Sequence, residues 1–147
     1  YGVLPSDEVS KDISVEPVMS FCGPIVNVRK VPAGTQVSYG GVFTTEKETN
    51  IAVVQAGFAD GFPRAWYEKG FVGYKGQTYK IAGRVCMDQF MVDFGDVKPN
   101  ECEEVLFFGK KDGNEIAVET IAREINTTTY VLLTAIHGRT ERIVINN

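Results

Sequence analysis

Three short segments of the sequence carry residue types that folding alone does not explain. In the first, residues 37–41 (V-S-Y-G-G), Tyr39 stands immediately before two glycines. Glycines inside a strand weaken it and usually mark a bulge, or a place where a ligand or another backbone approaches closely. A tyrosine at such a place is a candidate general acid or base. The alternative is a core tyrosine beside a bulge, and these residues taken alone favour it.

The second segment, residues 57–64 (G-F-A-D-G-F-P-R), follows an apolar run. We expect its two aromatic side chains, Phe58 and Phe62, to be exposed, and its Asp-Gly pair to form a turn. Arg64 could bind a carboxylate or a phosphate, or simply lie in solvent. Functional loops have this composition, and so do ordinary turns.

The third segment, residues 83–89 (G-R-V-C-M-D-Q), places Arg84 and Asp88 in an otherwise apolar strand. A charge that points into a barrel is costly unless it is paired, so we expect an ion pair of Arg84 or a contact with a ligand. Asp88, Asp93 and Asp96 suggest a divalent metal, but strand alternation separates Asp88 from Asp93. A metal site is therefore the weaker option, and we predict none.

The cysteines and the histidine limit the chemistry further. Cys22, Cys86 and Cys102 are widely spaced and form no C-x-x-C pair, so we expect three reduced thiols in a cytoplasmic protein. His137 is the only histidine, which excludes a His-based metal cluster or a His-paired nucleophile within the chain. A helix-end position, where the helix dipole favours a positive charge, is the preferred interpretation of His137.

The composition bounds the class of protein. The chain has 147 residues, a formal net charge of -4 and 44% hydrophobic residues, which fits one globular domain. Its mild acidity argues against a nucleic-acid partner or a basic membrane-surface protein, and no apolar run approaches the roughly 20 residues of a membrane span. Since the chain begins with Tyr1 rather than Met, we expect a processed or excised piece.

The elements that must position these segments are mostly strands. Short runs rich in Val, Ile and Phe, separated by turn residues, predict strands over residues 15–22, 25–31, 36–44, 51–56, 71–74, 78–81, 84–94 and 104–108. In the longest run, Val85, Met87 and Met91 alternate with Cys86 and Phe90. The Lys-Gly pair at residues 75–76 predicts a tight hairpin. We predict a mainly β fold, a small Greek-key-like β-barrel.

The periodicity changes from 2 to 3.6 after residue 113. The apolar spacing predicts an amphipathic helix over residues 118–125, and Asn126 is expected to cap a second helix over residues 127–136. That second helix is predicted to present Tyr130, Leu133, Thr134 and His137 on one face. A strand over residues 141–146 completes the predicted fold, which therefore has a helical hairpin near the C-terminus.

In this order, the three segments resemble the C-terminal domain of bacterial alanine racemases. The resemblance covers nearly the whole chain, and the ordered set is far more specific than any one motif. Further matching positions are Tyr1-Gly2 and Pro5-Ser6 at the start, Thr129-Tyr130 in the helical hairpin, and Arg139 and Arg142 near the end. It implies that residues 1–12 are a linker from a missing N-terminal barrel, and that residues 13–147 form the C-terminal β domain.

In that family an N-terminal (β/α)8 barrel holds pyridoxal phosphate on a lysine, and the C-terminal domain of the other subunit completes the site. The resemblance thus implies a homodimer that interconverts L- and D-alanine and supplies D-alanine for peptidoglycan. Inversion requires that a proton be removed on one face of the α-carbon and another delivered on the opposite face. The lysine serves one face, and Tyr39 matches the tyrosine that serves the other.

The same matching implies further roles. Met87 resembles the residue whose backbone amide meets the substrate carboxylate, and Tyr130 the tyrosine that hydrogen-bonds the cofactor phosphate. The positions that resemble the lining of the substrate access passage are Phe58, Arg64, Arg84 and Asp88. The family has a tyrosine where Phe58 stands, so we expect a changed polarity of the passage and no loss of the main base.

The barrel and its cofactor-binding lysine are absent from these 147 residues, so we expect the chain to hold half of the chemistry and to be inactive alone. A serine racemase of the same family is an alternative. So is a non-catalytic β domain used for dimerisation or binding, which Phe58 modestly favours. We also expect the side chains near Phe58, Phe62 and Met87 to be partly bare and to favour self-association.

Overall fold

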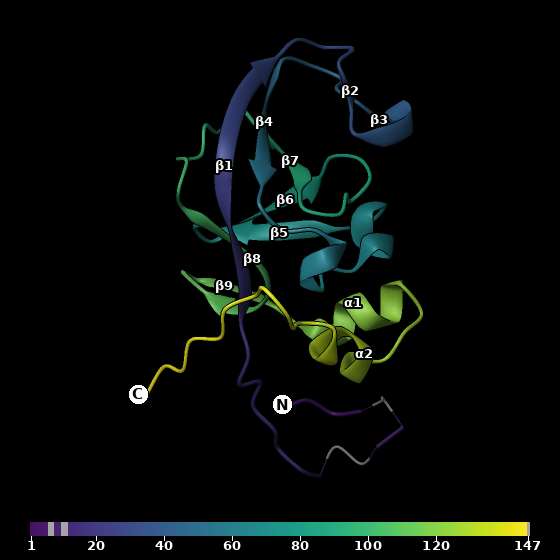
Figure 1. Ribbon diagram of the computed structural model, residues 1–147, viewed down its shortest axis with the longest axis vertical. Helices are drawn as coiled ribbons and strands as arrows, with labels where there is room; N and C mark the ends of the chain where they lie inside the picture. The colour runs from purple at the N-terminus through teal and green to yellow at the C-terminus, as the bar shows by residue number, and fades with distance from the viewer. Residues whose placement is uncertain (6–7, 10–11, 147) are drawn as a thin grey trace.

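The computed structural model describes residues 1–5, 8–9 and 12–146, and it is mainly β (Figure 1). The strands are β1 (Phe21–Val31), β2 (Gln36–Val37), β3 (Phe43–Thr44), β4 (Thr49–Val54), β5 (Phe71–Tyr74), β6 (Gln77–Ile81), β7 (Phe90–Gly95), β8 (Glu104–Lys111) and β9 (Asn114–Ile116). The α-helices are α1 (Val118–Glu124) and α2 (Thr129–Thr134), and short 3-10 turns are η1 (Tyr39–Gly41), η2 (Phe58–Asp60) and η3 (Arg64–Tyr67).

Within the described residues, six antiparallel strands close into a barrel in the order β1-β4-β7-β6-β5-β8, and β8 pairs with β1 again. β9 pairs with the last three residues of β8, Gly109 to Lys111, and β2 and β3 form a separate short ribbon. Closure removes the unpaired edges that an open sheet of this size would expose. The predicted mainly β barrel is confirmed, as is the helical hairpin, which lies at one end of it (Figure 1).

β1 is one long strand where the sequence predicts strands over 15–22 and 25–31. Residues 14–20 form no strand, and β1 runs through Pro24 without interruption. It changes partner there: Phe21 to Pro24 pair with β8, and Ile25 to Val31 pair with β4. A proline is tolerated where pairing changes over, because the missing N–H falls where the ladder is already irregular.

Three other predicted strands differ from the structure. Residues 84–89 form a loop, and only Phe90–Gly95 of the predicted 84–94 strand is β7. The predicted 36–44 strand is interrupted by η1, where Gly40 and Gly41 have positive φ angles. Residues 141–146 form no strand. The ends of the 36–44 segment pair with each other as β2 and β3, whereas residues 84–89 and 141–146 have no neighbouring strand to pair with in the described structure.

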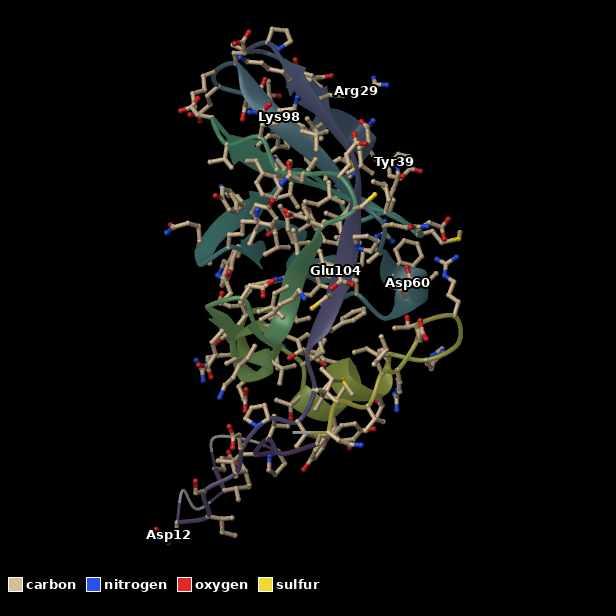
Figure 2. All side chains as sticks on the ribbon, turned by 90° about the vertical axis from the view of Figure 1, so that its left-hand side faces the viewer. Asp12, Arg29, Tyr39, Asp60, Lys98 and Glu104 are labelled. Atoms are coloured by element: carbon tan, nitrogen blue, oxygen red, sulfur yellow. The ribbon has the colours of Figure 1, made fainter. Side chains whose placement is uncertain are left out.

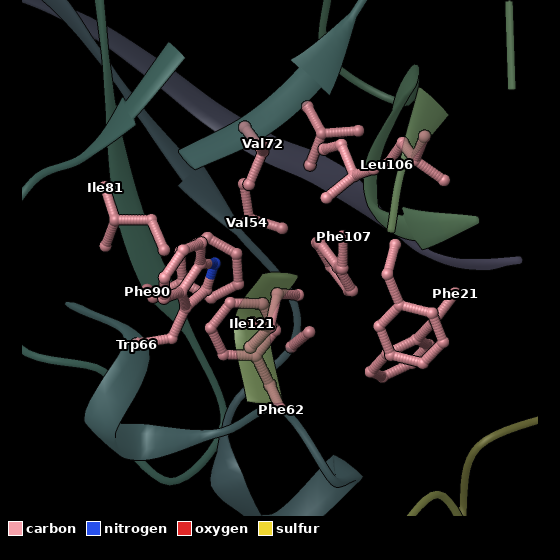
Figure 3. Packing of buried hydrophobic residues seen from close by; sticks show 14 of the residues in the cluster. Phe21, Val54, Phe62, Trp66, Val72, Ile81, Phe90, Leu106, Phe107 and Ile121 are labelled. Carbon is pink, nitrogen blue, oxygen red and sulfur yellow. The ribbon is translucent and has the colours of Figure 1, made fainter. Parts of the chain in front are cut away.

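The core is built around aromatic side chains inside the barrel (Figure 3). Phe62 is only 2% exposed and stacks on Phe90 at 4.4 Å between ring centroids, with Phe107 edge-on at 5.0 Å. The prediction that Phe62 is exposed is therefore wrong. The loop after β4 turns Phe62 into the core because burial of this large apolar side chain lowers the free energy by more than the bending of the loop raises it.

The helices pack as a pair against one end of the barrel. α1 buries Val118, Ile121 and Ala122, as predicted. α2 buries Thr129, Leu132 and Leu133. Of the face predicted for this helix, Leu133 is buried, whereas Tyr130, Thr134 and His137 are exposed. The N-cap is Thr128, whose hydroxyl accepts a 3.4 Å bond from the Val131 amide, and not Asn126. His137 is exposed just beyond α2.

The first residues pack on this helical end. Val3 is buried in the main core, and the Leu4 carbonyl accepts a 3.3 Å hydrogen bond from the Thr129 hydroxyl. Residues 6, 7, 10 and 11 of the predicted 1–12 linker, including Ser6 of the matched Pro5-Ser6 pair, lie outside the described residues.

The predicted hairpin is confirmed, since Lys75 and Gly76 join β5 to β6 with positive φ angles.

Candidate functional site

The three segments singled out in the sequence meet at one place on the barrel surface. The Ser38 hydroxyl donates a 2.7 Å hydrogen bond to the Arg84 carbonyl, which links the first segment to the third. The Phe58 and Ala59 amides donate to the Cys86 and Met87 carbonyls at 3.1 and 3.0 Å, which links the second to the third. The third segment therefore lies between the other two and holds both.

Tyr39 projects outward from this place, and its side chain is 68% exposed (Figure 2). Its backbone is held by the tight η1 turn, in which Ser38, Gly40 and Gly41 all have positive φ angles. The Ser38 hydrogen bond to the Arg84 carbonyl ties the turn that carries Tyr39 to the third segment. The interpretation of Tyr39 as a core tyrosine is wrong, and its phenol is free to meet a molecule from outside.

Arg84 lies beside Tyr39. Its Nη1 atom is 2.8 Å from where a Cβ on Gly40 would be, so a side chain at Gly40 would displace the guanidinium. Among the described residues Arg84 has no ion pair, so the predicted pairing is wrong. Residues 84–89 form a loop, and the Arg84 side chain is half-buried at the surface rather than inside the barrel. Its charge therefore remains partly solvated without an ion pair.

The second segment supplies an apolar wall. Phe58 is 43% exposed, and the Arg64 guanidinium lies 5.7 Å from the centroid of its ring, a cation–π distance. Gly57 is required where this loop crosses the third segment, because a Cβ there would lie 2.2 Å from the Met87 carbonyl oxygen. The backbone that carries Phe58 thereby lies directly against Met87.

Met87 is at the tip of a tight turn closed by the Cys86 amide on the Gln89 carbonyl at 2.9 Å. Its side chain is 56% exposed. Within the described part of the chain, the Met87 N–H donates no hydrogen bond. A backbone N–H left free at an exposed turn can bind an anion such as a carboxylate.

Asp88 is held by an arginine from the far end of the sequence. Arg139 contacts Asp60 through Nε at 2.6 Å and Asp88 through Nη2 at 2.5 Å. These carboxylates raise the pKa of Arg139 above its usual range, and the largest cause is the hydrogen bond that Arg139 donates to Asp60. The sequence marks Arg139 only as a match to the family, and gives no signal for the pairing with Asp60, which lies 79 residues away.

Tyr130 is exposed on the first turn of α2, and no contact with Tyr39, Phe58 or Met87 is found among the described residues. Its helix is tied to the site at its other end, since a Cβ on Gly61 would lie 2.6 Å from the Ala135 carbonyl oxygen. Of the predicted site residues, the structure therefore gathers Tyr39, Arg84, Met87 and their neighbours in one place and leaves Tyr130 apart.

The described residues contain no cluster of three His, Cys, Asp or Glu side chains that could hold a metal ion. In the same part of the chain, the three cysteines are free thiols and no helix is long and apolar enough to cross a membrane. The site thus consists of a phenol, a backbone amide, an aromatic wall and arginines.

Comparison with known proteins decides the family. The sequence profile described as alanine racemase, C-terminal domain, matches residues 18–144. The chain belongs to this family. The alanine racemase C-terminal domain also accounts for the fold: the alanine racemase of Streptomyces coelicolor A3(2) has a TM-score of 0.92 and 38% identity over 100% of this chain. That of Bacillus anthracis, solved with bound L-Ala-P, has a TM-score of 0.92 and 31% identity.

Related sequences agree in name. The alanine racemase of Desulfosudis oleivorans is 40% identical over 99% of this chain, and that of Clostridium novyi is 39% identical over 100% of it. The match covers 38% and 39% of those proteins. This alanine racemase C-terminal domain therefore spans less than two fifths of the length of the relatives it matches.

Proposed function

We propose that this chain supplies one half of an alanine racemase active site, with Tyr39 as the base on one face of the substrate α-carbon. The observation that carries the proposal is the convergence of three segments on one surface. It places the exposed Tyr39 phenol, the free Met87 amide and the Phe58 ring on backbones that are hydrogen-bonded to each other. Such mutual support is what a site that must hold a small substrate in one orientation requires.

In the proposed reaction, the deprotonated Tyr39 oxygen takes a proton from the α-carbon of one enantiomer. When the other enantiomer is the substrate, the protonated Tyr39 hydroxyl donates its proton to the α-carbon. A second base outside this chain handles the opposite face, and configuration inverts because the two protons move on opposite sides. The Met87 amide donates to the substrate carboxylate. Phe58 and Arg64 border the access passage, and Phe58 offers there a ring without a hydroxyl.

Pyridoxal phosphate fits the residues that this chain presents. The Tyr130 hydroxyl is exposed and can donate a hydrogen bond to a phosphate oxygen. When bound, the cofactor supplies an electron sink that makes the α-proton acidic. The lysine that would carry it is assigned to an N-terminal barrel domain, since no lysine here lies in the matching motif.

We assign residues 1–12 to the linker from that barrel, and the exposed surface around Tyr39, Phe58 and Met87 to contact with the barrel of a second subunit in a homodimer. The three free thiols support a cytoplasmic location. The chain alone is proposed to be inactive, because half of the catalytic groups are elsewhere.

The experiment is racemisation of D- and L-alanine with added pyridoxal phosphate, by the chain mixed with a separately produced family barrel domain. We expect activity only in the mixture, with each component alone as control. Tyr39→Phe removes one hydroxyl and should lower kcat by at least about 100-fold without preventing assembly. If the two domains assemble but the mixture has no racemase activity, the proposal is overturned in favour of a non-catalytic binding domain.

A further inference from the structure

Arg139 ties together two loops that belong to different segments of the site. It lies beyond the end of α2, in a stretch without helix or strand. Its Nε and Nη2 atoms bind the two oxygens of Asp60 at 2.6 and 3.2 Å, and Nη2 also binds Asp88 at 2.5 Å. One planar guanidinium thus joins the loop after β4 to the loop before β7.

Asp60 is built into its loop. Its side chain is 15% exposed, and Oδ2 also accepts a 2.8 Å hydrogen bond from the Gly57 amide. Its backbone carbonyl accepts from the hydroxyl of Thr140, the residue after Arg139, at 3.2 Å. Asp60 therefore connects the start of the loop, where Phe58 follows Gly57, to the C-terminal segment.

Asp88 is the residue directly after Met87. Without Arg139, the charges of Asp60 and Asp88 would face each other across the same small space, and like charges at that range repel. That repulsion would act on the two backbone hydrogen bonds between these loops, from Phe58 to Cys86 and from Ala59 to Met87. The guanidinium replaces repulsion by two attractive contacts.

An arginine suits this place better than a lysine. The paired contact to Asp60 needs two donors in one plane at fixed spacing, which a guanidinium has and an ammonium group lacks. The segment that carries it is also fixed, since Arg142 Nη2 donates to the Ile136 carbonyl at 2.7 Å. The donor group is thus held from behind.

We propose that Arg139 is a positioning residue of the half-site: by clamping Asp60 to Asp88 it fixes the Met87 amide and the Phe58 ring relative to Tyr39. This assignment rests on the proposed function for its effect on catalysis. Its effect on the loops does not depend on activity, and it can be measured on the chain alone.

The first test is amide hydrogen exchange of the 147-residue chain. In Arg139→Ala we expect the Ala59 and Phe58 amides to exchange about tenfold faster. Arg139→Lys should lie between, because it keeps the charge and loses the fork. Arg29→Ala removes an exposed arginine from β1, away from Asp60 (Figure 2), and should change nothing at these amides.

Should Arg139→Ala fail to fold, Asp88→Ala gives the same decision, because it removes the acceptor through which Arg139 holds the loop before β7. We expect exchange at Ala59 to rise about threefold in that variant. Ala59 exchange within twofold of the unmodified chain, in whichever of the two variants folds, would overturn the clamp.

The second test uses the active mixture with the barrel domain. Arg139→Ala is expected to raise KM for alanine about tenfold and to change kcat less than about twofold, with partial recovery of KM in Arg139→Lys. A fall in kcat as large as the rise in KM, or an unchanged KM, would overturn the positioning role. If the unmodified mixture is silent, the proposed function fails, and the exchange result still decides whether the clamp exists.

Discussion

The Ser38 hydroxyl and the Arg84 carbonyl, 46 residues apart in sequence, are joined by a 2.7 Å hydrogen bond. This contact holds the residue before Tyr39 against the loop that carries Met87. Ser38 has a φ of 66°, a left-handed conformation that few residues other than glycine adopt readily. A conformation of this kind is maintained when neighbouring contacts fix it, and the hydrogen bond to Arg84 is one of them.

Ser38→Ala should lower the free energy of unfolding by about 1 kcal/mol, because the Arg84 carbonyl loses a half-buried donor while the backbone strain remains. Urea denaturation measures the change. Ser14→Ala, at an exposed position outside any strand, is the control and is expected to change stability by less than about 0.5 kcal/mol. Equal stabilities of the two variants would contradict the role of this bond.

Gly57→Ala should destabilise the chain by about 2–3 kcal/mol or more, because the new Cβ would lie 2.2 Å from the Met87 carbonyl oxygen and 2.4 Å from that of Cys86, both of them backbone atoms. Gly34→Ala is the matched control: its φ is +82° but nothing lies within 4 Å. It should lose only about 1 kcal/mol from backbone strain. Thermal denaturation of the pair separates collision from strain.

Phe62→Ala should destabilise the chain by about 3–5 kcal/mol, because the ring is 2% exposed and its removal leaves a cavity against Phe90 and Phe107. Phe58→Ala, four residues earlier, removes a ring that is 43% exposed and should lower the free energy of unfolding by less than about 1 kcal/mol. Comparable losses for both rings would show that the division between core and site surface is wrong.

Cys22 should be the slower of two thiols to react with iodoacetamide. Burial, as the largest cause, raises the pKa of this thiol from 9.0 to about 11, and Glu104 adds to the shift. Because the thiolate is the reactive form, the alkylation rate should climb as the pH rises toward about 11. Exposed Cys102 serves as the internal comparison by mass spectrometry. When the chain is unfolded in urea, the burial is lost, and the pH at which Cys22 alkylation accelerates should fall toward 9.0.

Much of the architecture was predictable because local pattern and tertiary packing agree. The strand over 71–74 has the predicted bounds, and the Lys75–Gly76 turn has the positive φ angles that a tight hairpin requires. α1 buries the predicted apolar face. In these elements, neighbouring residues supply the partners themselves, so short-range spacing is sufficient information.

The errors share one physical cause. Residues 84–89 and 141–146 contain apolar residues typical of strands, but pairing depends on a neighbouring strand elsewhere in the chain, and none is placed beside them in the described structure. From the sequence Phe62 resembles an exposed aromatic residue of a loop, but in the folded chain it packs inside the barrel. Apolar side chains favour burial, but the tertiary structure determines which of them are buried and which segments pair as strands.

The family of this domain and the order of its three functional segments follow from the sequence alone, because each motif is a short local run and the three occur in a specific order. The sequence also marks Tyr39 and Met87 as matching positions. The fold was needed to show that Tyr39 is exposed, that the Met87 amide donates no hydrogen bond within the described residues, and that Arg139 joins Asp60 to Asp88. Exposure and long-range hydrogen bonds depend on which distant segments the closed barrel brings together, and no spacing within a single motif specifies that.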